Sequence, residues 1–329
     1  MIVKLFIGTY GSNLYICPFN VENFTFGELH AVATDNPSAI LLGEKAFYCV
    51  NETDGNAAVT SFDLQTFNSY GRISGPGESP CSLFLDANRN LLLTADYGGG
   101  SVTAFSLLEN GAVGHKVQQL QFGEQSRMHQ IIPFNDDYLF ASDLGCNCIR
   151  ILRFNGNSLV EVKGAEFFCG EGSGPRHMTL NSSKTKLYCI CEKSGELLAF
   201  DVALECKKPV LSLCQREMAE EVPAHGSGDI LIHPCGRFIY TSHRLVNDGI
   251  SIYEITAEGL VKRGYTKTGI HPRGLWLSPD GSALLAACGN SNRIEAYRID
   301  QNTGLLTLVS TISFENERPV WITDASSKR

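Results

Sequence analysis

The side chains best suited to chemistry are concentrated in residues 172–192. The segment 172–178 reads Gly-Ser-Gly-Pro-Arg-His-Met, so that Arg176 lies beside His177, and Glu192 follows at the end of the next apolar run. A carboxylate or an imidazole can exchange a proton with a substrate, and a guanidinium can bind an anion or stabilise a developing oxyanion. This stretch therefore carries the densest cluster of groups capable of acid–base and anion-binding chemistry.

The elements around these residues repeat along the whole chain. Helical periodicity is nearly absent, while short β-rich runs alternate with turns rich in Gly, Asn, Asp and Pro. Aligning the units on His177 gives spacings of 43 to 52 residues between equivalent positions. The aligned positions are Ala39, Ser82, His129, His177, Asp229, Gly274 and Trp321. Such a period is typical of β-propeller blades, and this alignment gives His129 and His177 the same position in adjacent blades.

The two ends of the sequence predict how the ring closes. Only one strand, residues 320–323, follows Pro319, and residues 3–9 and 13–19 supply partners that lack an inner strand. Together they complete a seventh blade and remove open sheet edges. We therefore expect an all-β, seven-bladed β-propeller with four-stranded antiparallel blades, as a single domain over residues 1–329. The least patterned stretch, residues 205–223, is expected to be a surface excursion before the fifth blade.

The repeat also predicts where the reactive side chains meet. In an up-and-down blade, the start of the first strand and the end of the second lie on the same rim near the axis. The candidates at strand starts are Arg127, His129, Arg176, His177, Asp229 and Arg273. Those at strand ends are Asn51, Glu52, Asp96, Tyr97, Asp143, Glu192, His243 and Arg244. These side chains are expected to converge on one mouth of the central channel.

Each candidate also has a structural interpretation. Aspartates such as Asp143 can bond to loop amides, and arginines can bridge neighbouring blades. Three arginines serving only as bridges on one rim is the less favoured interpretation. The histidines without a coherent position in the repeat are expected to be structural or exposed: His30, His115, His225, His233 and His271.

Composition excludes several classes of protein and partner. The net charge of −8 argues against a nucleic acid or an anionic membrane surface as partner, and no window approaches an apolar run of about 18 residues. The twelve cysteines include no Cys-x-x-Cys pair, the N-terminus lacks the features of a signal peptide, and several thiols lie in apolar strand runs. We therefore expect a cytoplasmic protein without a metal site, and the outer strands do not indicate an oligomeric state.

The sequence resembles the lactonase family of seven-bladed propellers, which includes propeller-type 6-phosphogluconolactonases and carboxy-muconate lactonizing enzymes. The resemblance covers nearly the whole chain, from residues 5–10 to 319–321, and its most specific motifs are residues 172–178, Glu192 and residues 271–274 (His-Pro-Arg-Gly). Residues 280–281 and 302–306 also match. The resemblance implies a site formed by His129, Arg176, Glu192 and Arg273, with His177 and Arg244 beside them. The third blade departs from the pattern because it has no proline before His129.

The resemblance implies hydrolysis of a sugar lactone such as 6-phosphogluconolactone. Glu192 or His129 would activate water, and the arginines would stabilise the oxyanion and bind a phosphate. Asp143 and His243 are further candidates for substrate binding, and no cofactor or metal is required. The expected partner is a small anionic sugar lactone or carboxylate. A muconate-type cycloisomerase, which uses the same groups, and a non-catalytic binding or scaffold propeller are the alternatives.

Overall fold

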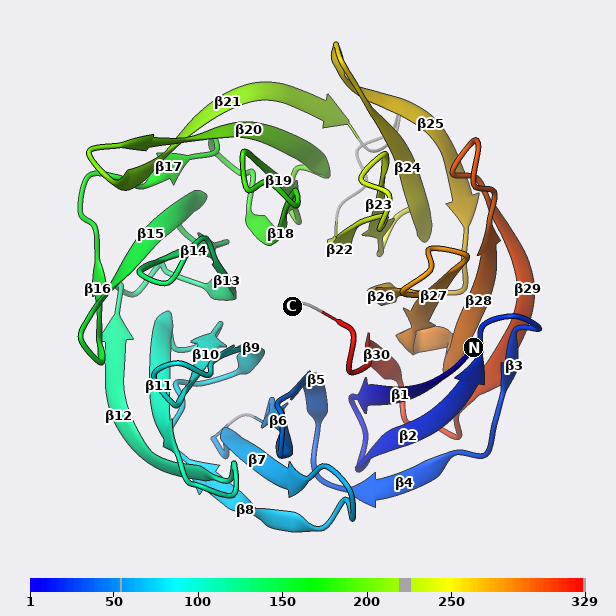
Figure 1. Cartoon of the computed structure of the whole chain (residues 1–329), viewed down its shortest axis with the longest axis horizontal. Coiled ribbons are helices and arrows are strands. Elements are labelled where there is room, and N and C mark those ends of the chain that lie inside the picture. Colours follow the sequence, from blue (N-terminus) through cyan, green and yellow to red (C-terminus); the bar gives the residue numbers. More distant parts are fainter. Residues whose placement is uncertain (54, 219–225, 328–329) are drawn as a thin grey trace.

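The computed structural model describes residues 1–53, 55–218 and 226–327. They form seven antiparallel β-sheets arranged as blades around a central axis, as the sequence predicts (Figure 1). Each blade begins with its innermost strand, and the following strands lie progressively further from the axis. The only helical element among the described residues is a 3-10 turn, η1 (Gly289–Ser291).

The strands of the seven blades follow one another in chain order. Blade one consists of β5 (Pro37–Leu42), β6 (Ala46–Asn51), β7 (Ala58–Asp63) and β8 (Ser69–Ser74). Blade two consists of β9 (Pro80–Asp86), β10 (Leu91–Asp96), β11 (Ser101–Leu107) and β12 (Val113–Gln121). Blade three consists of β13 (Met128–Pro133), β14 (Tyr138–Asp143), β15 (Cys148–Asn155), β16 (Ser158–Glu161) and β17 (Phe167–Phe168). Blade four consists of β18 (Pro175–Leu180), β19 (Lys186–Cys191), β20 (Glu196–Glu205) and β21 (Lys208–Met218).

The last three blades include the one that joins the two ends of the chain. Blade five consists of β22 (Ser227–Ile232), β23 (Phe238–His243), β24 (Gly249–Thr256) and β25 (Gly259–Lys267). Blade six consists of β26 (Pro272–Leu277), β27 (Ala283–Cys288), β28 (Arg293–Ile299) and β29 (Leu306–Ser313). Blade seven consists of β30 (Pro319–Thr323), β1 (Ile2–Thr9), β2 (Asn13–Asn20), β3 (Thr25–Phe26) and β4 (His30–Ala33).

Blade seven closes the ring as expected. β1 pairs with β2 on one side and with β30 on the other, so that Ile7 lies opposite Ile322. Just before β30, the Glu317 carboxylate accepts hydrogen bonds from the backbone N–H groups of Ser12 (2.9 Å) and Asn13 (3.2 Å). The seam between the two chain ends is thus held by a strand pair and by a half-buried carboxylate beside it.

A β-bulge lies at the start of the inner strand in every blade. In blade four, Pro175 is opposite Cys191 and His177 is opposite Ile190, so Arg176 is the extra residue. The bulge positions of the other blades are Ser38, Cys81, His129, Gly228 with Asp229, Arg273 and Val320. A bulge re-aims the side chains around it. The seven bulges therefore fix a ring of side chains at the face where the inner strands begin, here termed the entry face.

The bulge register corrects one part of the repeat alignment. The pairing of β13 with β14 places His129 at the bulge position, equivalent to Arg176 and not to His177. Met128 stands where blade four has a proline. Blade three therefore lacks the proline that lies two residues before the aligned position in blade four, and its alignment was displaced by one residue. Gln130 is the equivalent of His177.

The least patterned stretch of the sequence is more regular than expected. Residues 205–218 belong to the long outer hairpin of β20 and β21 and do not form an irregular excursion. Residues 219–223 lie outside the described residues. Most side chains of β21 are exposed or half-buried. Only Pro209 and Leu211 of this strand are buried, so it shows little of the apolar alternation by which strands are recognised, and this explains the wrong expectation.

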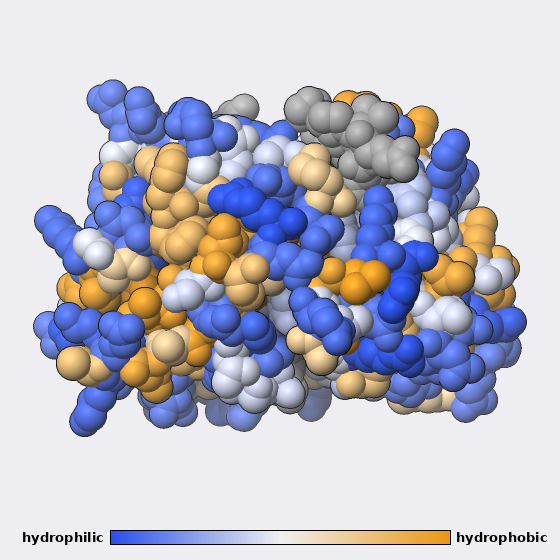
Figure 2. Space-filling model, turned by 90° about the horizontal axis from the view of Figure 1, so that it is seen from above, coloured by the Kyte–Doolittle hydropathy of each residue, from blue (hydrophilic) through white to orange (hydrophobic). Residues whose placement is uncertain are grey.

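Apolar side chains fill the space between adjacent blades. The buried Trp276 of β26 packs edge-on against Phe19 of β2, within the cluster that joins blades six and seven. Seen from the side, the molecule is a thick disc with a mainly hydrophilic surface and scattered apolar patches (Figure 2). Within the described residues there is no apolar helix of membrane-spanning length.

Candidate active site

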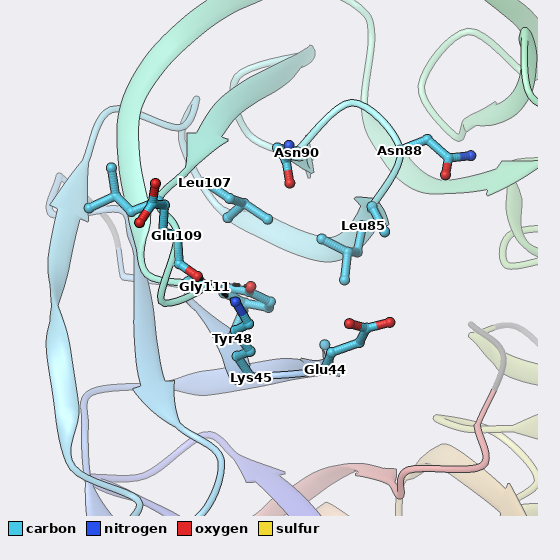
Figure 3. A pocket seen from close by; sticks show the side chains of 12 residues that line it. Glu44, Lys45, Tyr48, Leu85, Asn88, Asn90, Leu107, Glu109 and Gly111 are labelled. Carbon is cyan, nitrogen blue, oxygen red and sulfur yellow. Dashed lines mark hydrogen bonds between the residues drawn. The ribbon is translucent and has the colours of Figure 1, made fainter.

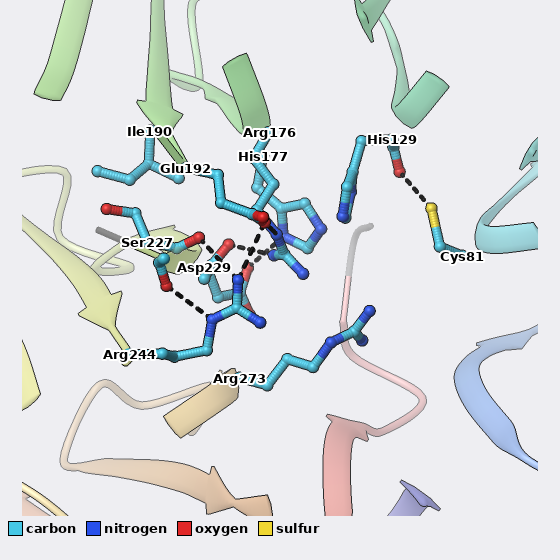
Figure 4. Close-up of polar contacts among 12 residues, drawn as sticks. Cys81, His129, Arg176, His177, Ile190, Glu192, Ser227, Asp229, Arg244 and Arg273 are labelled. Carbon is cyan, nitrogen blue, oxygen red and sulfur yellow. Dashed lines mark hydrogen bonds and ion pairs between the residues drawn. The ribbon is translucent and has the colours of Figure 1, made fainter. Parts of the chain in front are cut away.

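Two rings of positions meet at the entry face. One is the ring of bulge positions, and the other consists of the residues that directly follow the second strand of each blade. The members of this second ring are Tyr10, Glu52, Tyr97, Leu144, Glu192, Arg244 and Gly289. Because the first strand begins where the second ends, both rings lie on one face of the disc. Side chains far apart in sequence, such as His129 and Arg273, are thereby brought to the same site (Figure 4).

Glu192 is held between two arginines. Its Oε2 accepts hydrogen bonds from Arg176 Nε (2.7 Å) and Arg244 Nη2 (3.0 Å), as Figure 4 shows. Within the described residues Oε1 accepts no hydrogen bond, and the side chain is 27% exposed. Burial raises the pKa of Glu192, but Arg176, Arg244 and Arg273 outweigh it and lower the pKa below its usual value. Glu192 is therefore an anion at neutral pH, with one oxygen fixed and the other open to solvent.

The two arginines of this clamp are themselves fixed by backbone carbonyls. Arg176 donates from Nη1 to the carbonyl of Gly228, and Arg244 donates from Nε to the carbonyl of Gly226 (2.7 Å). Both side chains are buried. Burial and the neighbouring Arg176 lower the pKa of Arg244 to about 9, so that it is still a cation at neutral pH. The expected association of Arg176, Glu192 and Arg244 is confirmed by these contacts.

Arg273 keeps its donors available. Its guanidinium lies over the Tyr10 ring, 5.0 Å from the centroid, and Nη2 is 3.8 Å from Glu52 Oε2. Within the described residues the guanidinium makes no hydrogen bond, although the side chain is only 8% exposed. Tyr10 donates to the same Glu52 oxygen (3.1 Å). Figure 4 shows the guanidinium pointing into the middle of the entry face, where a bound anion would meet it.

His129 is buried and neutral. Burial, followed by the nearby Arg176, holds its pKa well below the usual value. Its ring packs edge-on against Tyr97 and His177, with centroid distances of 5.9 Å and 5.0 Å, and within the described residues its Nδ1 has no hydrogen-bond partner. His177 in turn contacts Asp229 through Nδ1 (2.8 Å). The structure thus places both predicted imidazoles side by side at the entry face.

Asp143 and His243 do not join this group. Asp143 is fully buried and accepts four hydrogen bonds within its own blade, one of them from Ser126 (2.7 Å). The two ring nitrogens of His243 contact the hydroxyl groups of Ser227 (3.0 Å) and Thr241 (2.9 Å), and burial lowers its pKa to about 3. Neither side chain has a free polar group to offer a substrate. Each is the last residue of its second strand, one position before the residues equivalent to Glu192 and Arg244, and reasoning from strand ends alone did not separate the two positions.

Two residues at the site, Tyr10 and His271, were not assigned to it from the sequence, whereas Glu52 was expected at this rim. Tyr10 and Glu52 adjoin Arg273, and His271 lies beside Arg244, with 3.4 Å between His271 Nε2 and Arg244 Nη1. Burial and the surrounding arginines lower the pKa of His271 to about 3. The signal for His271 was the motif His-Pro-Arg-Gly at residues 271–274. Tyr10 carried no signal, because its place depends on the closure of the ring.

Three of the other histidines fall outside the site. His30 and His115 are exposed and His233 is buried, in agreement with the expectation that they are structural or exposed. His225 lies outside the described residues.

A separate depression of about 630 Å³ lies on the opposite face (Figure 3). It is lined by turns of blades one and two, where Tyr48 donates to the Gly111 carbonyl (2.8 Å) and Lys45 to that of Glu109 (2.8 Å). None of Arg176, Arg244 and Arg273 lines it. We therefore assign the candidate site to the entry face.

Comparison with known proteins gives a consistent result. Residues 4–323 match the family model described as "Lactonase, 7-bladed beta-propeller". A 6-phosphogluconolactonase of Pectobacterium carotovorum is 31% identical over 77% of this chain and 76% of its own length. A crystal structure of a candidate 6-phosphogluconolactonase from Bacteroides fragilis superposes with a TM-score of 0.91 at 32% identity, covering 98% of this chain and 97% of the other. A periplasmic gluconolactonase of Pseudomonas aeruginosa shares the fold, with a TM-score of 0.89 at 21% identity and coverage of 98% and 99%.

Proposed function

This chain belongs to the lactonase family of seven-bladed β-propellers, and we propose that it hydrolyses a sugar lactone of the 6-phosphogluconolactone type. The observation that carries the proposal is the pairing of a fixed carboxylate with a free cation. Glu192 is oriented by two arginines with Oε1 open to solvent, and Arg273 presents unused N–H groups at the same face. Such a pair can activate water and stabilise an oxyanion.

The proposed reaction begins with water held by Glu192 Oε1. The water oxygen bonds to the lactone carbonyl carbon while Glu192 takes its proton, and the carbonyl oxygen becomes an oxyanion facing Arg273. The ring C–O bond then breaks, and the proton on Glu192 passes to the departing ring oxygen. Glu192 is favoured over His129 as the base because it is accessible to water, whereas His129 is buried. A carboxylate with a lowered pKa is a modest base, so the guanidinium groups supply most of the rate enhancement.

The state of the cysteines supports a reducing compartment. All twelve are free, including pairs such as Cys189 and Cys191 on one strand. Disulfides are rare where thiols are kept reduced, and we place this protein in the cytoplasm on that ground.

The proposal is tested by measuring hydrolysis of 6-phosphogluconolactone and of gluconolactone by the purified protein against the spontaneous rate. Acceleration that is lost in Glu192→Gln and Arg273→Met supports it. Absence of acceleration with both lactones refutes it, and turnover of a muconate-type diacid without uptake of water would identify a cycloisomerase instead.

A further inference from the structure

Arg318 and Tyr10 lie beside Arg273 at the entry face and form a second group that can bind an anion. The backbone N–H of Tyr10 donates to the carbonyl of Arg318 (3.1 Å), across the seam where the two ends of the chain meet. The Arg318 guanidinium lies over the Tyr10 ring, 5.4 Å from its centroid, and the Arg273 guanidinium lies over the same ring at 5.0 Å. One aromatic ring thus holds two cations, which come from blade six and from the segment that leads into β30.

The backbone of Arg318 is held in an unusual conformation. Its φ of 48° lies in the left-handed region, which is costly for a residue with a side chain. The Arg318 N–H donates to Asn292 Oδ1 (3.2 Å), and Nη2 donates to Asn290 Oδ1 (3.1 Å). The other guanidinium N–H groups have no hydrogen-bond partner among the described residues, and the side chain is exposed. Backbone strain that the surroundings maintain tends to occur at functional sites.

A neutral imidazole, that of His271, lies beside Arg244 on the same side of the entry face. Its Nε2 faces Arg244 Nη1 at 3.4 Å, and because arginine has only donors, Nε2 accepts and the ring proton lies on Nδ1. That Nδ1 is buried, and among the described residues it has no hydrogen-bond partner. The turn η1 links His271 to Arg318, since the Gly289 N–H donates to the His271 carbonyl (3.0 Å) and Asn290 accepts from Arg318.

The charge at the entry face suits a ligand with two negative charges. Four guanidiniums, those of Arg176, Arg244, Arg273 and Arg318, stand near the carboxylates of Glu52 and Glu192. Asp229 contacts His177 (2.8 Å), and Asp248 accepts from the His271 N–H (2.7 Å). Glu192 already occupies two of the four guanidiniums, while Arg273 and Arg318 keep free donors. In a chain with a net charge of −8, this concentration of guanidiniums is a specific feature of the site.

We infer that Arg318 forms a subsite for the phosphate of a phosphorylated sugar lactone, on the blade six–seven side of the entry face. This inference rests on the proposed function. The lactone carbonyl lies against Glu192, Arg273 stands between the two ends of the substrate, and the phosphate receives bidentate N–H groups from Arg318, whose guanidinium shares the Tyr10 ring with that of Arg273. Arg318 thereby distinguishes phosphorylated from unphosphorylated lactones.

The test compares two substrates in Arg318→Ala. We expect the KM for 6-phosphogluconolactone to rise about tenfold, as for loss of a charge-assisted contact, with kcat unchanged and with gluconolactone kinetics unaffected. Arg318→Lys should recover part of the loss, because it restores the charge but not the fork. Arg298→Ala is the matched control, since Arg298 is also exposed and also lies over an aromatic ring, that of Phe24 at 5.2 Å, on an outer strand of blade six.

The outcomes separate this inference from the lactonase proposal. An equal loss with both lactones, or no loss with either, overturns the phosphate subsite while leaving hydrolysis intact. If the wild-type protein accelerates neither lactone, the subsite is still tested by calorimetric titration with 6-phosphogluconate and gluconate. Binding of 6-phosphogluconate about tenfold weaker in Arg318→Ala, with gluconate unchanged, supports the subsite, and equal binding by the two proteins refutes it.

Discussion

Replacing Glu192 with glutamine removes one negative charge from between two buried guanidiniums while preserving the size of the side chain. A general base typically contributes about 10²–10⁴ in rate, so we expect kcat/KM for lactone hydrolysis to fall by about 10²–10³. The charge is also part of the local structure, because Oε2 accepts from both Arg176 and Arg244. Removing one partner of a fully buried ion pair costs about 3–5 kcal/mol. The 27% exposure of Glu192 and the oxygen that glutamine retains reduce the expected loss of stability to about 1–2 kcal/mol.

The assay measures initial rates with freshly prepared lactone, corrected for spontaneous opening, alongside urea unfolding of the same protein. Glu254→Gln is the matched control, because Glu254 also contacts two arginines, Arg237 and Arg263, but lies on β24, an outer strand of blade five. The control should retain full activity. A folded Glu192→Gln protein with kcat/KM within threefold of wild type would refute Glu192 as the base.

Three further results are expected. Arg273→Met should lower kcat about 10²–10³-fold, as for loss of an oxyanion donor. Stability in urea should change little, because the guanidinium makes no hydrogen bond within the described residues. A kcat within fivefold of wild type contradicts this prediction. Between pH 6 and 4.5 the free energy of unfolding should fall by about 4 kcal/mol per pH unit, since the folded-state pKa values of His129, His243 and His271 lie below 6.5 and only the unfolded chain takes up protons there; His129→Gln should remove about a third of this slope, and an unchanged slope in urea titrations speaks against it. Glu317→Ala should cost about 1–3 kcal/mol and speed amide hydrogen exchange in β1 and β30, because it removes acceptors at the ring seam; exchange that is faster elsewhere but not there is the contrary result.

The fold was readable from the sequence because each blade repeats a local pattern that does not depend on distant contacts. Prolines marked the start of the inner strand in five blades, but not in the third, where Met128 replaces the proline and shifts His129 by one position, nor in the fifth, where Ser227 stands in that place. The outer hairpin of β20 and β21 escaped recognition because only Pro209 and Leu211 of its solvent-facing strand are buried. Sequence periodicity therefore predicts the buried inner strands well and the exposed outer strands less precisely.

The site was only partly readable for a different reason. Arg176, Glu192 and Arg273 stood in motifs whose register the repeat fixes. The position of a residue at a strand end does not show whether its side chain points towards the axis or into its own loop. The Asp143 side chain points into its own loop. Tyr10 and Arg318 come together only when the two ends of the chain pair, and no local sequence pattern predicts this contact.

The ring of bulges separates the demands of folding from those of chemistry. The same backbone irregularity carries serine, cysteine, histidine, arginine and valine in different blades, so strand pairing there does not select the side chain. A mutation at such a position can exchange a functional group without disturbing the scaffold that holds it. Homologous propellers can therefore acquire new substrates through single substitutions at these positions, because the fold around them is already stable.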